Sequence, residues 1–74
     1  MGVIDPMEEA AGLCESAADE LDLAARHSRT AAAHYRNREV PRAAAHEWAA
    51  HGHIRAAEDA LDAQARTHAK KSVP

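Results

Sequence analysis

Histidine is the residue type in this sequence that could most directly support metal chemistry. Six histidines occur in 74 residues: His27, His34, His46, His51, His53 and His68. A helical chelate usually places two histidines three or four residues apart on one face, and no pair here has that spacing. His27 and His34 are seven residues apart, about 10.5 Å along a helix, which is too far to share one ion. His46 and His53 repeat this spacing, so a metal site would have to lie between two helices.

The composition predicts an all-α chain. Alanine, the best helix former, accounts for twenty residues, and there is no phenylalanine. Asp5 and Pro6 are typical of an N-cap and a first helical residue. Val40 precedes Pro41 and is disfavoured in a helix, which predicts an interruption there.

We expect one domain containing an antiparallel helical hairpin. Its expected parts within residues 1–74 are a first helix over about 6–36, a turn over about 37–41, a second helix over about 42–69 and a frayed tail over 70–74. One long helix kinked at Pro41 is the alternative, which the loop-like stretch before the proline disfavours.

A seven-residue repeat on the first helix predicts an apolar packing seam. The repeat consists of Met7, Cys14, Leu21, Ser28 and Tyr35, with alanines such as Ala25 three or four residues after its members. Ile54 and Leu61 provide a less regular counterpart on the second helix. The resulting dimer or core seam is expected to include Cys14, Leu21, Ala25, Ile54 and Leu61. On both helices, the apolar side chains cover a wider part of the helix surface than one partner helix can bury. We therefore expect two hairpins to form a four-helix bundle.

The charge distribution favours an antiparallel homodimer. Residues 1–24 contain seven acidic residues and no lysine or arginine, whereas residues 25–42 contain five arginines and one glutamate. The open end of a hairpin is therefore acidic on its first helix, and the turn end is basic. An antiparallel pair of hairpins would place each basic turn near the acidic end of its partner.

A hairpin also predicts which histidines face one another. If the turn centres near residue 39, His34 lies near His46, and His27 lies near His51 and His53. A metal- or small-ligand-binding bundle that uses His27, His34, His46 and His53 is thus an alternative function. The Glu-x-x-His motif of di-iron bundles is missing. The other interpretations are histidines that flank the seam, partly exposed or bonded to carboxylates, and a pH-sensitive interface.

Trp48 is the strongest candidate for contact with another protein. Exposed tryptophan and arginine are typical of interface hot spots, and the predicted partner-binding surface comprises Trp48, Tyr35, Arg38, Arg42 and Gly52. Gly52 costs about 1 kcal/mol relative to alanine in a helix interior, which favours a close-packing role. Alternatively, Trp48 packs across the dimer or against Tyr35.

Other function classes lack supporting residues, so we predict a non-enzymatic interaction or adaptor protein without a cofactor. Cys14 has no evident base beside it, and no other nucleophile–base pair is apparent. The net charge of −3 and the lack of a continuous basic face argue against nucleic acid as a partner.

No apolar run is long enough to span a membrane, and MGVIDPMEEA lacks the features of a signal peptide. We therefore expect a cytoplasmic protein, and the Ala/Arg/Asp/Glu bias suggests a bacterium with GC-rich DNA.

Overall fold

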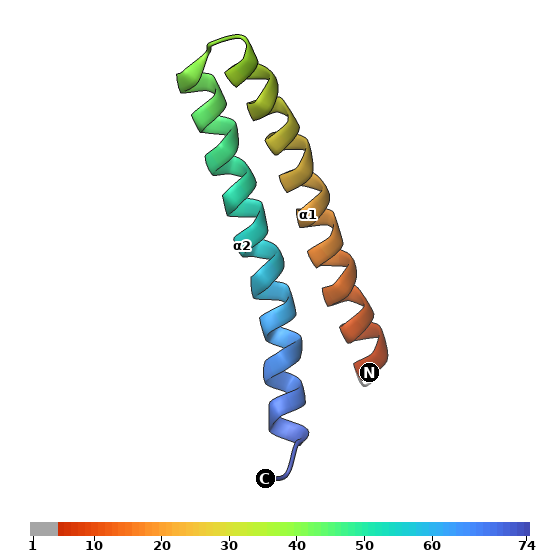
Figure 1. Ribbon diagram of the computed structural model, residues 1–74. Coiled ribbons are helices and arrows are strands. Elements are labelled where there is room, and N and C mark those ends of the chain that lie inside the picture. The colour runs from red at the N-terminus through yellow and green to blue at the C-terminus, as the bar shows by residue number, and fades with distance from the viewer. Residues whose placement is uncertain (1–4) are drawn as a thin grey trace.

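Two long helices lie side by side and run in opposite directions (Figure 1). A computed structural model describes residues 5–74, in which α1 spans Pro6–Arg36 and α2 spans Val40–Lys71. α1 begins and α2 ends at the side of the hairpin opposite the turn (Figure 1). The predicted all-α hairpin is thus confirmed. Residues 1–4, which open the segment used to argue against a signal peptide, lie outside the described residues.

The turn is made by a left-handed residue that is not glycine. Arg38 has φ 63°, and its N–H donates to the Tyr35 carbonyl at 3.0 Å, while the Glu39 N–H donates to the His34 carbonyl at 2.9 Å. These two bonds form a Schellman motif, which satisfies carbonyls that the helix end leaves without partners. Arg38 therefore has a backbone role in reversing the chain.

The other helix ends follow from local chemistry. Asp5 caps α1 by accepting a hydrogen bond from the Met7 N–H at 2.9 Å, as its residue type predicts. α2 starts at Val40, about two residues earlier than expected. Pro41 then lies in the first turn, where its missing N–H leaves no helical bond unmade.

The contact between the helices is made by small side chains. Among residues 5–74, the buried side chains are all alanines: Ala17, Ala24 and Ala31 on α1, and Ala43, Ala50 and Ala57 on α2. Each set repeats every seven residues, the period of helices that pack nearly antiparallel. Methyl groups at these positions allow the two backbones to approach closely.

This narrow contact separates the neighbouring side chains onto two sides. With 3.6 residues per turn, a residue three positions after a central alanine lies about 60° to one side, and a residue four positions after it lies about 40° to the other. His27 and His34 lie three positions after Ala24 and Ala31. Leu21 lies four positions after Ala17 and therefore on the opposite side.

The expected seam residues do not form the core of the hairpin. Cys14 is exposed in the single hairpin. Leu21 and Leu61 are each 48% exposed, and Ile54 is 37% exposed, whereas Ala25 is half-buried. The physical reason is the width of the contact, because two helices that meet through alanine cover little beyond it. Burial of these residues by a second chain stays a prediction.

No helix within residues 5–74 is long and apolar enough to cross a membrane.

The alanine contact predicts a sharp positional effect of added volume. Ala31→Leu should destabilise the hairpin by about 1–3 kcal/mol, because the larger side chain must force the helices apart. Ala33→Leu is the matched control, since Ala33 is exposed on the same turn of α1, and its effect should stay within about 0.5 kcal/mol. Urea unfolding followed by circular dichroism measures both, and equal effects would contradict the alanine contact.

Candidate functional site

Four histidines from both helices form one continuous row of neighbouring rings, here called the histidine ladder: His53, His27, His46 and His34. The ring centroids of His53 and His27 are 5.5 Å apart, those of His27 and His46 are 5.2 Å apart, and those of His46 and His34 are 5.4 Å apart. The middle pair also makes a hydrogen bond, with 2.9 Å between the Nδ1 atoms of His27 and His46. All four side chains are partly buried.

The observed register matches part of the expected pairing. His34 stacks on His46 and His27 stacks on His53, at the two levels that the turn position predicts. His51 does not join them, because it is exposed and its ring lies against Trp48. The additional contact between His27 and His46 was not foreseen, since it depends on the stagger between the helices.

A carboxylate holds each end of the histidine ladder. His53 Nδ1 lies 2.6 Å from Glu20 Oε2, and His34 Nδ1 lies 3.3 Å from Glu39 Oε1. A carboxylate only accepts hydrogen bonds, so both histidines donate from Nδ1. Between His27 and His46, one Nδ1 carries a proton and donates the hydrogen bond, and the other Nδ1 accepts the hydrogen bond. The role of Glu20 was not predicted, although Glu20 precedes His27 by seven residues and so shares its stripe.

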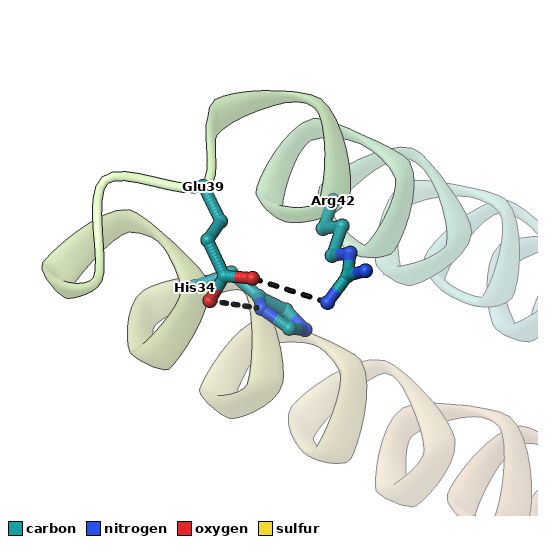
Figure 2. Close-up of polar contacts among 3 residues, drawn as sticks. All are labelled: His34, Glu39 and Arg42. Carbon is teal, nitrogen blue, oxygen red and sulfur yellow. Dashed lines mark hydrogen bonds and ion pairs between the residues drawn. The ribbon is translucent and has the colours of Figure 1, made fainter.

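Glu39 joins the turn to both helices (Figure 2). Its Oε1 accepts a hydrogen bond from His34 Nδ1 of α1. Its Oε2 accepts a hydrogen bond from Arg42 Nη1 of α2 at 3.1 Å. The hydrogen bond from His34 lowers the pKa of Glu39, desolvation opposes this shift, and the charges of His34 and Arg42 add to it. The Glu39 carboxylate is therefore favoured by its surroundings in the folded hairpin.

Of the predicted partner residues, Trp48 lines a hollow on α2 together with Glu47 and His51, which were not predicted, and these three residues are here called the tryptophan patch. Trp48 is 75% exposed, and its ring meets that of His51 edge-on at 6.1 Å. The Tyr35 hydroxyl donates to Glu47 Oε1 at 2.7 Å, and this hydrogen bond raises the pKa of Tyr35. Tyr35 thus links α1 to the edge of the patch.

The remaining predicted partner residues have different surroundings. Arg38 forms the turn, and Arg42 is paired with Glu39. A Cβ added to Gly52 would meet no atom within 4 Å apart from its local helix backbone. Gly52 therefore has no close-packing role inside the hairpin.

In the part of the chain that the structure describes, no group of three or more His, Cys, Asp or Glu side chains is arranged to hold a metal ion. Comparisons with protein-family models, with curated proteins and with solved structures find no match to this chain. The geometry itself describes an antiparallel helical hairpin with a polar ladder on one side of an alanine contact.

The lowered pKa of Glu39 predicts an acid-dependent contribution to stability. A carboxyl whose pKa falls on folding stabilises the folded state above its ordinary pKa of about 4.5, and this contribution disappears as the pH falls through the lower, folded-state pKa. Glu39→Gln should therefore lower the unfolding temperature at pH 6, and this effect should shrink as the pH falls below about 4.5.

Thermal unfolding followed by circular dichroism across this range measures the difference, and Glu58→Gln at an exposed position is the control. A constant offset between Glu39→Gln and the unchanged chain at every pH would contradict the assignment.

Proposed function

We propose that this chain is a non-enzymatic helical interaction module that self-associates into a four-helix bundle. The supporting observation is a set of large apolar side chains left exposed beside the alanine contact. Its members, here called the apolar face, are Met7, Leu21 and Tyr35 on α1 and Val40, Ile54 and Leu61 on α2. On each helix they lie at seven- or fourteen-residue intervals, so they form two adjoining stripes.

The energetics favour covering the apolar face. The buried side chains of a single hairpin are all alanines among residues 5–74, and a chain this short buries too little surface to be very stable alone. Full burial of a leucine or isoleucine side chain contributes about 1.5–3 kcal/mol. Covering Leu21, Ile54 and Leu61 would thus supply the larger core that the hairpin lacks.

A second copy of the chain is the proposed occupant of this face. The apolar stripes repeat at the seven-residue spacing that helices use to pack along one another. In an antiparallel dimer, the arginine-rich residues 25–42 of one copy would meet the acidic residues 1–24 of the other. This arrangement buries apolar side chains and pairs opposite charges at both ends.

The tryptophan patch supports a second contact, with a different protein. Trp48 is five residues after the buried Ala43, which places it about 140° away from the interhelical contact. A dimer built on the apolar face would leave its indole accessible. Large aromatic side chains of this kind provide much of the affinity in protein interfaces, so an adaptor role fits a dimer that presents two such patches.

The self-association proposal predicts a concentration-dependent dimer. Light scattering at micromolar concentration should give twice the 8.0 kDa mass of the chain. Ile54→Lys should weaken the dimer at least tenfold, because it puts a charge into the buried face. Val73→Lys is the control, since Val73 lies after α2 and is 91% exposed. A monomeric unchanged chain, or equal effects of both substitutions, would contradict the proposal.

Trp48 fluorescence separates the two contacts. We expect the purified protein to show the red-shifted emission of a hydrated indole and efficient quenching by acrylamide, because the apolar face does not include Trp48. Emission should be unchanged between concentrations at which the chain is monomeric and dimeric. A blue shift and loss of quenching on dimerisation would mean that Trp48 lies in the dimer interface and is not available to another protein.

A further inference from the structure

A polar residue continues the apolar repeat of α2 at each end. The seven-residue repeat that contains Ile54 and Leu61 extends to Glu47 on the side of the turn and to His68 on the side of the open end. These four residues, here called the α2 stripe, are all exposed in the single hairpin. If two copies of the α2 stripe lie antiparallel, Ile54 meets Leu61 twice at the centre, and Glu47 meets His68 at both ends.

The corresponding repeat on α1 is symmetric about Leu21. Cys14 and Ser28 lie seven residues before and after Leu21, and Met7 and Tyr35 lie fourteen residues before and after it. These five residues, here called the α1 stripe, are also exposed in the single hairpin. If two copies of the α1 stripe lie antiparallel, Leu21 meets itself, Cys14 meets Ser28, and Met7 meets Tyr35.

The centres of the two stripes lie at nearly the same height in the hairpin. The ring of His27 stacks on that of His53, which aligns α1 with α2. Leu21 is six residues from His27 toward the open end, a distance of about 9 Å along the helix. The midpoint between Ile54 and Leu61 is four to five residues from His53 in the same direction, a distance of about 7 Å. One two-fold axis can therefore pass close to both centres.

We propose that two copies of the hairpin associate about this axis, so that α1 packs on α1 and α2 packs on α2 of the second copy. This inference rests on the proposed self-association, and it adds which helices face each other and in which register. The interface is isologous, because each residue pair occurs twice, once in each direction. Its outer contacts join Glu47 of each copy to His68 of the other.

Tyr35 holds Glu47 in place for this contact. The Tyr35 hydroxyl donates to Glu47 Oε1 at 2.7 Å, between two residues that lie on the α1 and α2 stripes. A carboxylate can accept several hydrogen bonds, so an imidazole N–H from His68 of the second copy can join this pair without displacing Tyr35. A polar contact inside an apolar interface specifies the register, because a shift along the helices would leave its members without partners.

Small side chains on α1 permit two copies of this helix to approach each other closely. Four alanines each lie four residues after a member of the α1 stripe: Ala11, Ala18, Ala25 and Ala32. They are therefore about 80° from the contact with α2. A helix in a four-helix bundle has its two neighbours about 90° apart, so these alanines face α1 of the second copy.

The charges of α1 favour the same pairing. The part of α1 before Leu21 contains acidic residues and no arginine or lysine, whereas the part after Leu21 contains three arginines and one acidic residue. Antiparallel packing about Leu21 brings the acidic part of each α1 beside the basic part of the other. Two α1 helices in parallel would instead place like charges together, which is unfavourable.

Disulfide cross-linking of the full chain tests the register. Leu21→Cys in a Cys14→Ser background should give a covalent dimer on mild oxidation, because the two thiols meet at the axis and a disulfide needs Cα atoms within about 7 Å. The unchanged chain is the matched control, since its two Cys14 side chains would lie about 21 Å apart along the helices and should cross-link at least about tenfold more slowly. Ser28→Cys with Cys14 in place should restore rapid cross-linking.

Charge exchange tests the outer contacts without a new thiol. His68→Glu should raise the dissociation constant of the dimer at least about tenfold, because it places carboxylates opposite each other at two points. Adding Glu47→Lys to His68→Glu should recover most of this loss. Thr67→Glu is the matched control, since Thr67 is the exposed neighbour of His68 and lies outside the stripe. Its effect should stay within about twofold.

The results distinguish the register from the self-association itself. In a chain that is dimeric by light scattering, faster cross-linking through Cys14 than through Leu21→Cys would overturn the register and leave the dimer in place. Equal effects of His68→Glu and Thr67→Glu on the dissociation constant would also overturn it. A chain that is monomeric by light scattering would remove both proposals.

Discussion

The close alanine contact between α1 and α2 is the constraint on which the rest of this structure depends. Only methyl groups lie between the helices at their central positions, so the backbones approach closely and nothing larger fits there. This closeness lets the side chains on either flank meet across the contact. The centroids of neighbouring histidine rings lie 5.2–5.5 Å apart because the alanine contact brings side chains of the two helices together.

The two flanks of this contact differ in chemistry and therefore in what they require from the surroundings. On the histidine side, the polar groups satisfy one another, and no buried side-chain nitrogen or oxygen within residues 5–74 lacks a partner. On the other side, Leu21, Ile54 and Leu61 remain partly in water. Only the apolar side gains free energy by being covered.

The turn sets the register that makes this arrangement possible. The Schellman bonds around Arg38 reverse the chain within a few residues, and Glu39 then contacts both helices. With this reversal, His27 faces His53 and His34 faces His46. A turn of different length would shift one helix along the other and separate the rings.

The sequence by itself determined the helices, their antiparallel order and the approximate level of each histidine, because alanine content, the Asp5 cap and Pro41 act locally. It did not determine which of the adjoining stripes would be central. Leu21 and Ala24 belong to neighbouring stripes, and hydrophobicity alone favours the larger side chain. Close approach of the two backbones favours the alanine stripe at the centre of the contact. With alanine at the centre, Cys14 and Leu21 are exposed and Glu20 contacts His53. Such contacts depend on interhelical distance and stagger, which only the tertiary structure decided.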